Sequence, residues 1–264
     1  MPHQHRSQRV EAVVLRHSDW GEADRLLWLF TRELGKVRAI AKGARKPRSR
    51  KAGHLEPFTR ASLLLARGRD LLIVTQAEAI DLYQTVRADL VCLGYAAYVV
   101  ELLDRFTYEE GENQALYHLL VETLSRLNEE SVAAFPVRYY EVRLLDLVGF
   151  RPQLQRCVEC GKEIQAEDQY FSAEKGGVLC PGCGTKERTA HMVTLPALKV
   201  LRHMQRSNYS QAKRARLSTS VDRELEYLMG HYLTYLLERG LNSPAFLRRV
   251  RADASRASLD QSET

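Results

Sequence analysis

Apolar and polar residues alternate with a period of two over residues 9–80, and this pattern constrains the fold more than any other feature of the chain. Five short runs rich in branched and aromatic residues are separated by turn-forming residues: VEAVVLR, RLLWLFT, KVRAIAK, ASLLLAR and LLIVTQAE. Each run has the length and composition of one β-strand. Closing such short strands into a barrel removes every exposed sheet edge. We therefore predict an OB-fold, a small nucleic-acid-binding barrel, over residues 1–80.

From residue 86 onward the apolar period changes to that of a helix. The first helical segment carries its apolar stripe at Leu90, Leu93, Ala97, Val100 and Leu103. Further amphipathic segments follow at 113–130, 132–150, 195–207 and 220–240. The predicted fold class is therefore α+β and multidomain, with an α-helical domain at 81–250 after the barrel. The small, polar residues at 251–264 predict a disordered tail.

Two Cys-x-x-Cys pairs, Cys157 with Cys160 and Cys180 with Cys183, interrupt the helical pattern. The chain starts without the apolar core of a secretory signal, so we expect a cytoplasmic protein whose thiols stay reduced. In that compartment, paired cysteines at this spacing indicate a metal site. A glycine after each pair lets the backbone turn tightly, which places four sulfurs at tetrahedral corners. We predict a zinc-binding insertion at about 150–190.

Four thiolates fill the coordination sphere of zinc, so we expect a structural Zn²⁺ and not a catalytic one. A redox pair, two unrelated cysteine pairs and iron in a rubredoxin-like site are the alternatives that the spacing leaves open. His54–Glu56 matches half of a zinc-deaminase signature, but Leu179 stands where that signature needs a proline. The sequence contains no phosphate-binding loop, Ser–His–Asp motif or dinucleotide fingerprint, and we expect no enzymatic activity.

Residues 36–51, here called the basic segment, contain eight cations and no acidic residue, in a chain of net charge +6. These cations are Lys36, Arg38, Lys42, Arg45, Lys46, Arg48, Arg50 and Lys51. A solvated loop is the ordinary interpretation of such a run, but eight like charges repel one another and an acidic partner relieves that repulsion. We expect the partner to be nucleic acid.

Phosphates, and not bases, are the expected contacts of the basic segment. No Asn or Gln occurs between Val10 and Thr75, so the amide side chains that read bases are missing nearby. Lys36, Arg38 and Lys42 fall at even positions and share one strand face. Trp20, Trp28 and Phe58 are candidates for stacking on bases. We expect Trp28, which is flanked by apolar residues, to pack in the core.

Several long segments resemble the RecO family of recombination mediators. They are EADRLLWLFTRELGKVRAIAKGARKPRSR, ELLDRFTYEEGENQALYHLLVETL, YYEVRLLDLVGFRPQLQRCVECG and YFSAEKGGVLCPGCG. The resemblance runs in the family's order from about residue 9 to 207. It implies an N-terminal OB-fold, a helical domain and, as in many members, a four-cysteine zinc site inserted in that domain.

The resemblance also implies a function. Members of the family bind single- and double-stranded DNA, anneal complementary strands and work with RecR to load RecA. They also bind the acidic C-terminal tail of single-stranded DNA-binding protein. Lys199, Arg202 and Arg206 share one helix face, and we expect a groove for such a tail beside helices 86–149 or 194–207. We further expect a monomer or weak oligomer that associates with the nucleoid.

Two other functional classes are compatible with parts of the sequence. A sequence-specific transcription regulator would use the cysteine unit as its reader, with basic residues on a helix beside Cys183. A metal-dependent enzyme would need an open coordination position, which four cysteines do not leave. The DNA-binding recombination mediator remains the predicted function.

Overall fold

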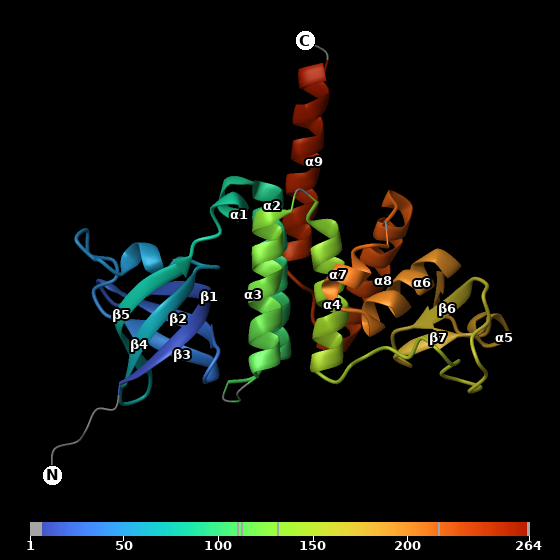
Figure 1. Cartoon of the computed structure of the whole chain (residues 1–264), viewed down its shortest axis with the longest axis horizontal. Coiled ribbons are helices and arrows are strands. Elements are labelled where there is room, and N and C mark those ends of the chain that lie inside the picture. Colours follow the sequence, from blue (N-terminus) through green and yellow to red (C-terminus); the bar gives the residue numbers. More distant parts are fainter. Residues whose placement is uncertain (1–6, 110, 112, 131, 216, 263–264) are drawn as a thin grey trace. The chain divides into compact units, whose positions relative to one another are not determined.

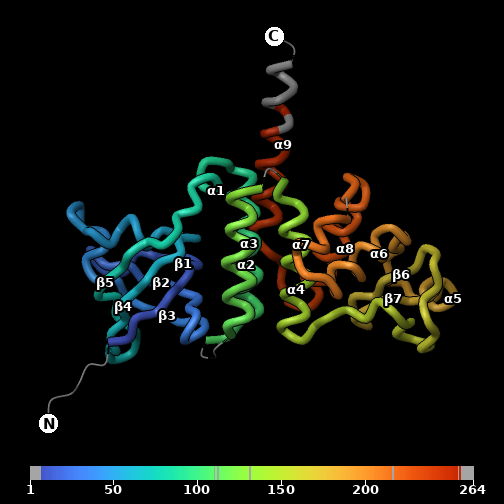
Figure 2. The backbone as a smooth tube through the Cα atoms, viewed as in Figure 1, coloured from blue at the N-terminus to red at the C-terminus, as the bar shows by residue number. Residues whose placement is uncertain are grey.

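The computed structural model describes residues 7–262 except 110, 112, 131 and 216, and Figures 1 and 2 follow the chain through it. The chain divides into two compact units. The first unit combines the residues before Val132 with those from Asn242 onward, and the second unit is Val132–Leu241. Among the helices of the described residues, none combines the length and apolar composition that crossing a bilayer requires.

The first unit begins with a closed five-stranded barrel, as the alternating pattern predicts. Its strands are β1 (Gln8–Trp20), β2 (Asp24–Thr31), β3 (Gly35–Ala41), β4 (Arg60–Arg67) and β5 (Leu72–Asp81), in the order β1-β2-β3-β5-β4. A 3₁₀ turn, η1 (Ala52–His54), lies between β3 and β4. The β1 strand pairs with β4 through its first half and with β2 through its second half. Its register shifts between Val14 and Arg16, and such a bulge bends the strand enough for it to pair with both β4 and β2.

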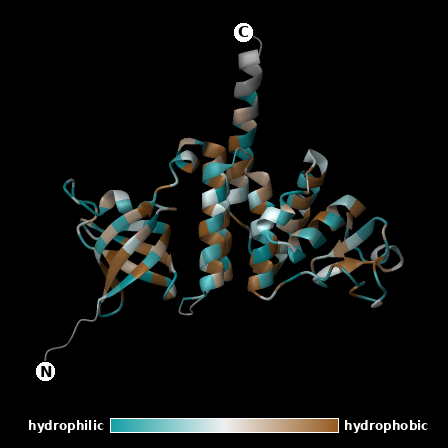
Figure 3. Cartoon of the chain, in the orientation of Figure 1, coloured by the Kyte–Doolittle hydropathy of each residue, from teal (hydrophilic) through white to brown (hydrophobic). Residues whose placement is uncertain are grey.

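Alternate residues of the strands fill the interior of the barrel. Figure 3 shows apolar and polar bands alternating across it. The buried cluster consists mainly of Ala12, Val14, Leu27, Leu29, Ala39, Ala41, Leu63, Leu65 and Val74. Because side chains on a strand point alternately to its two faces, the opposite positions of the same strands are free to carry charge outward.

Four helices complete the first unit: α1 (Gln84–Ala88), α2 (Leu90–Phe106), α3 (Gln114–Glu129) and α9 (Ser243–Ser262). Asp89 and Asn113 cap the N-termini of α2 and α3 by accepting hydrogen bonds from backbone N–H groups. Helix α2 packs against both α3 and α9. At Gly94 an added Cβ would lie 2.8 Å from a methyl carbon of Leu247, so the Leu247 side chain of α9 packs directly on the glycine.

One expectation from the sequence is corrected by this unit. Helices α1–α3 belong to the same compact unit as the barrel, and the domain boundary at residue 80 stays a prediction. The helix α9 continues to Ser262, so most of the predicted disordered tail at 251–264 is helical, and residues 263–264 lie outside the described part. After Pro244 this segment contains neither glycine nor proline, and nothing in it interrupts a helix once Leu247 is anchored.

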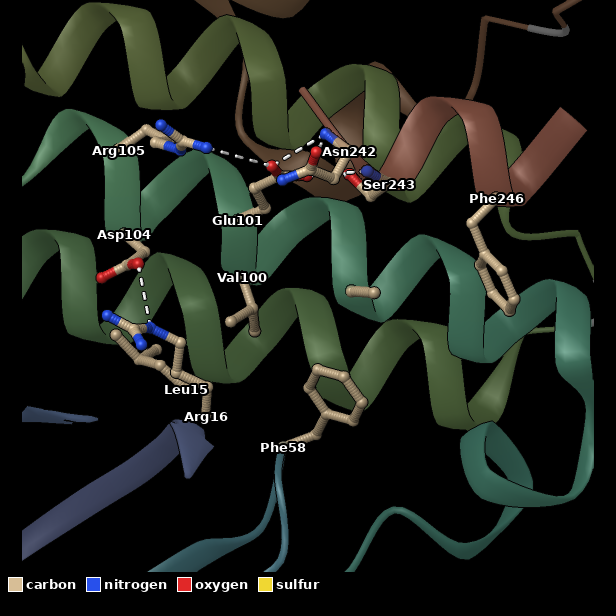
Figure 4. A pocket seen from close by; sticks show the side chains of 11 residues that line it. Leu15, Arg16, Phe58, Val100, Glu101, Asp104, Arg105, Asn242, Ser243 and Phe246 are labelled. Atoms are coloured by element: carbon tan, nitrogen blue, oxygen red, sulfur yellow. Dashed lines mark hydrogen bonds and ion pairs between the residues drawn. The ribbon is translucent and has the colours of Figure 1, made fainter. Parts of the chain in front are cut away.

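Glu101 of α2 holds the start of α9. Its carboxylate accepts hydrogen bonds from the backbone N–H of Asn242 at 2.9 Å, from the backbone N–H of Ser243 at 2.8 Å and from the Ser243 hydroxyl at 2.5 Å. Figure 4 shows this cluster at one end of a cavity of about 590 Å³ between α2, α9 and the β1 strand. The carboxylate thus replaces the acceptors that backbone N–H groups at a helix start otherwise lack.

The second unit contains three main helices and a small sheet. The helices are α4 (Ala134–Leu147), α6 (Leu195–Arg206) and α8 (Thr219–Leu237), with the short α5 (Pro181–Gly184) and α7 (Tyr209–Ala212). The sheet has the order β7-β6-β8, from β6 (Gln169–Ser172), β7 (Gly177–Leu179) and β8 (His191–Val193). Helix α4 packs against α6 and α8. The buried guanidinium of Arg138 lies 2.8 Å from the carboxylate of Glu141 in the same helix.

We predict that Glu101→Ala lowers the free energy of unfolding of the first unit by about 1–3 kcal/mol, because partly buried N–H groups at the start of α9 lose their acceptor. Urea denaturation of the full chain measures the change. The matched control is Glu129→Ala, which removes an exposed carboxylate at the end of α3. Equal stabilities of the two variants would contradict the role of Glu101 as the α9 cap.

Candidate metal centre and nucleic-acid interface

The four cysteines of the two pairs meet in the second unit. Their Sγ atoms all lie within 4.8 Å of one another, and those of Cys160 and Cys180 are 3.8 Å apart. A metal about 2.3 Å from each sulfur of a regular tetrahedron separates the sulfurs by about 3.8 Å. The thiols therefore fit a tetrahedral metal ion such as Zn²⁺, and we assign Cys157, Cys160, Cys180 and Cys183 as the four side chains that can hold it.

Tight backbone turns shape both halves of this cluster. In the first turn the N–H of Gly161 bonds to the carbonyl of Cys157 at 2.9 Å, and Gly161 has a φ of 72°, which suits glycine. In the second, the N–H groups of Cys183 and Gly184 bond to the carbonyl of Cys180. A Cβ on Gly184 would lie 2.3 Å from the ring of Tyr170 in β6, so this turn also needs glycine. The small sheet thus positions both cysteine pairs.

The thiols of the cluster differ in acidity. Burial raises the pKa of Cys157, but hydrogen bonds from backbone N–H groups, including those of Cys160 and Cys180, outweigh it and lower that pKa to about 6. The hydrogen bond with the Cys180 sulfur, followed by burial, raises the pKa of Cys183 to about 12. Adjacent thiolates repel one another, so the cluster ionises fully only when a cation offsets the charge. Metal binding here is expected to release protons.

His54 of the deaminase-like fragment lies in η1 of the first unit, whereas the four cysteines belong to the second unit. Its Nδ1 atom accepts a hydrogen bond from the backbone N–H of Ala79 at 3.2 Å. His54 therefore ties η1 to β5 and contributes nothing to the metal site, as the missing proline before Cys180 indicates.

Lys36 and Arg38, at the start of the basic segment, are paired with acidic residues of the first unit. The ammonium of Lys36 lies 2.6 Å from the carboxylate of Asp104 and also donates to the backbone carbonyls of Asp104 and Thr107. The guanidinium of Arg38 lies 2.7 Å from the carboxylate of Glu109. Only 12% of the Lys36 side chain is exposed. These two cations are therefore engaged within the protein.

Two further cations of the basic segment fasten it to the barrel. Arg45 pairs with Asp19 at 3.1 Å and donates to the carbonyls of Gly21 and Glu22. Lys51 donates to the carbonyl of Val74 in β5 at 3.2 Å. Both groups hold a loop that is also anchored by buried apolar residues, Ala44 near its start and Leu55 just after it. The backbone of the loop is thereby tied down at both ends.

The remaining four cations are Lys42, Lys46, Arg48 and Arg50, here called the loop cations. All four are exposed, and none forms an ion pair with another residue in the described part of the chain. At the base of the loop, the N–H of Gly43 bonds to the Asp24 carboxylate at 2.7 Å, and Gly43 has a φ of 64°. The arrangement presents unpaired positive charge on a fixed loop, which suits contact with phosphates.

Residues that the sequence pattern does not single out surround the paired end of β3. Glu109 forms a parallel bridge with Lys36, and the adjacent Tyr108 is 90% exposed. A cavity of about 300 Å³ lies here, with Lys36, Arg38, Arg67, Arg69, Asp70 and Glu109 among its lining residues. Four cations and two carboxylates, those of Asp70 and Glu109, are among the residues that line this cavity. Neither Asp104 nor Glu109 is identifiable as a partner of β3 from the sequence, because about 70 residues separate them from it.

The three aromatic candidates have different surroundings. Trp20 is 47% exposed at the end of β1. The guanidinium of Arg16 lies 3.5 Å from the ring centroid of Trp28, so Trp28 is half-buried beneath an arginine and not enclosed in the core. Phe58, with a φ of 69°, lines the cavity of Figure 4 beside α2. Of the three, Trp20 offers the most accessible ring to a nucleic-acid base.

Comparison with known proteins gives matches along nearly the whole chain. Residues 6–83 match a family model described as Recombination protein O N terminal, and residues 87–245 match one described as Recombination protein O C terminal. A DNA repair protein RecO of Roseiflexus sp. (strain RS-1) is 42% identical over 262 residues, covering 98% of this chain and 92% of the relative. The DNA repair protein RecO of Desulforudis audaxviator (strain MP104C) is 38% identical over 247 residues, covering 94% and 98%.

We predict that the purified protein contains about one tetrahedrally bound metal ion per chain and that Cys160→Ser abolishes most of it. Because the binding energy of such a metal is local folding energy, hydrogen exchange in Cys160→Ser should accelerate at residues 157–193 and stay unchanged in the barrel. Elemental analysis measures the first effect. The matched control is Cys92→Ser in α2, which removes a thiol outside the cluster. Full metal retention by Cys160→Ser would refute the site.

Proposed function

This chain belongs to the RecO family of DNA repair proteins, and we propose that it is a recombination mediator that binds single- and double-stranded DNA and anneals complementary strands. Membership of the family carries a role in DNA repair and recombination. The observation that supports the mechanism is the set of four unpaired loop cations on a fixed loop of the barrel. When the loop cations contact DNA, they screen the phosphates of both strands. This screening lowers the electrostatic repulsion that opposes pairing of the strands.

The mechanism requires binding and charge screening, and we propose that it involves no catalytic group. The four sulfurs of the cysteine cluster leave no coordination position for a substrate. We propose that this cluster holds Zn²⁺ as a structural ion, since its ligand set and sulfur spacing suit zinc. Iron would give the protein visible absorption, so a colourless protein containing zinc distinguishes the two metals.

The resemblance to the family supports further, more specific proposals. We propose that the protein acts with RecR to load RecA and that it binds the acidic C-terminal tail of single-stranded DNA-binding protein. These steps take place in the cytoplasm in association with the nucleoid. Pull-down of purified RecR, with and without DNA, tests the first partner directly.

A sequence-specific regulator that reads bases through the cysteine unit is the alternative function. The helix that follows Cys180 is α5, which has only four residues and places no long recognition helix beside the cluster. Helices that enter the major groove present several side chains over two or more turns. The geometry therefore favours the mediator.

The eight cations of the basic segment are expected to contribute unequally. The loop cations are free to meet phosphates at once, whereas Lys36 and Arg38 must first leave Asp104 and Glu109. Exchanging one salt bridge for another yields less free energy than pairing a free cation. We propose that the loop cations provide the first contacts and that Lys36 and Arg38 join only when a strand displaces their acidic partners.

We predict that the triple variant Lys46→Glu, Arg48→Glu, Arg50→Glu loses affinity for DNA of every sequence and anneals complementary strands more slowly. Each lost phosphate contact should reduce the slope of log affinity against log salt by about 0.7–0.9. The matched control reverses three exposed arginines on or near α8 and α9, Arg223, Arg239 and Arg248. Fluorescence anisotropy and a strand-annealing assay give the two readouts.

Two results of this experiment would contradict the proposal. If the loop variant kept its affinity at moderate salt, the barrel loop would not be the DNA site. If it lost affinity for one sequence only, its cations would read bases. Unchanged thermal unfolding of the variant is expected, because none of the three reversed side chains has an ion-pair partner in the described residues.

We predict that Glu109→Gln raises affinity for single-stranded DNA about two- to fivefold at low salt, because it frees the guanidinium of Arg38. The matched control is Glu129→Gln, an exposed carboxylate whose removal changes the net charge equally. Anisotropy titrations of the two variants at the same ionic strength compare them. If Glu109→Gln matches its control, Glu109 does not compete with phosphate.

A further inference from the structure

A second basic site lies in the other compact unit, on α6. A cavity of about 630 Å³ opens there, and here it is called the α6 pocket. Its lining includes Gln155, Lys199, Arg202, His203, Arg206 and Arg214. No acidic residue of the described part of the chain lines it. The charge of Glu163, which is not among the lining residues, acts to raise the pKa of Arg202.

The cations of the α6 pocket fall into two groups. The side chain of Arg202 is held in place at the wall of the pocket, because its guanidinium donates two hydrogen bonds to the carbonyl of Leu154, at 2.8 and 2.6 Å. Burial, followed by the positive charge of Arg206, lowers the pKa of Arg202. In contrast, Lys199, Arg206 and Arg214 are exposed and form no ion pair with a residue that the structure describes. Their charge is left uncompensated.

His203 holds the rim of the pocket in place. One ring nitrogen lies 3.1 Å from the carbonyl of Gln211 and the other 3.2 Å from the hydroxyl of Ser207. The contact with Gln211 connects the end of α6 to α7, which directly precedes the segment that carries Arg214. Cations from two different segments are thus held at the same cavity. Because they are already in place, binding an anion costs little conformational entropy.

The spacing of the free cations favours a chain of anions over a single one. Lys199 and Arg206 are seven residues apart on one helix, which places them about 10 Å apart along its axis. A lone carboxylate does not span that distance, whereas a run of phosphates does. No aromatic side chain of the described residues lines the pocket, and Val200 and Ala215 are its only apolar lining residues. A peptide would lack the apolar anchor site on which peptide recognition usually depends.

We propose that the α6 pocket binds the phosphate backbone of a second nucleic-acid strand while the loop cations hold the first. This inference rests on the proposed strand annealing, which needs two polyanions on one protein. Each compact unit then supplies one phosphate site. The free cations of the pocket replace the counterions of the second strand, and Arg202 and His203 keep the site open.

The test uses the full-length chain with Arg206→Glu and Arg214→Glu combined. The matched control, Arg223→Glu with Arg239→Glu, reverses two exposed arginines of the same unit outside the pocket. We expect annealing by the pocket variant to fall at least about tenfold below that of the control. The pocket substitutions and the control substitutions are also introduced separately into the loop variant. We expect the pocket substitutions to remove its residual binding of a labelled oligothymidylate and the control substitutions to leave that binding unchanged.

The outcomes separate the inference from the proposed function. If the pocket variant anneals like its control while the wild type anneals well, the inference is overturned and the proposed function stands. If the wild type does not anneal at all, the proposed function fails, and residual oligothymidylate binding by the loop variant still decides whether the pocket holds phosphates. If an acidic peptide binds through Arg206 and Arg214 but oligothymidylate does not compete with it, the pocket is a protein-binding site and the inference is wrong.

Discussion

The barrel closes through a short parallel contact, and the arrangement of its charges depends on that closure. Only Ala39 and Ile40 of β3 pair with β5, at Leu72 and Ile73. The earlier part of β3 therefore lacks a β5 partner, and the bridge between Lys36 and Glu109 takes that place. Because Glu109 follows the end of α2, closure of the barrel and docking of the helix bring acidic groups onto the basic strand. In the loop beyond β3, the four loop cations remain without an ion-pair partner among the described residues.

This division of charge gives the barrel two kinds of cation. Paired cations such as Lys36 contribute to the packing of α2 on the barrel, and moving them costs that contact. Unpaired loop cations have only water to replace, and their mutual repulsion falls when phosphates approach. The loop that carries the unpaired cations is anchored by Ala44 and Leu55, which are buried in the core. In the proposed mechanism these unpaired cations contact nucleic acid, whereas the paired cations stabilise the fold.

The barrel and the cysteine cluster could be predicted from the sequence because their signals are local. Alternation along each strand marks its core face, and the spacing of Cys157 to Cys183 brings four sulfurs together without reference to the rest of the chain. The α2 and α3 helices follow from their periodicity for the same reason. Family resemblance, confirmed by matches over nearly the whole chain, adds the role in DNA repair.

The rest depends on contacts between residues far apart in the chain. The eight cations of the basic segment look equivalent in the sequence. Two of them form ion pairs with Asp104 and Glu109, which lie about 70 residues further along the chain. The polar composition after residue 250 predicts disorder, yet the packing of Leu247 at Gly94 and the cap from Glu101 start a helix that continues through it. The periodicity change near residue 80 marks the change from strands to helices, and the contacts that place α1–α3 in one compact unit with the barrel leave no local signal in the sequence.

Hydrogen–deuterium exchange of the full-length protein, with and without a saturating oligothymidylate, tests the central claim that free cations and not the metal site hold nucleic acid. The account predicts protection of residues 42–51 in the barrel loop, and unchanged exchange at the cysteine sheet, residues 157–193. Protection confined to 157–193, with the barrel loop unaffected, would contradict it.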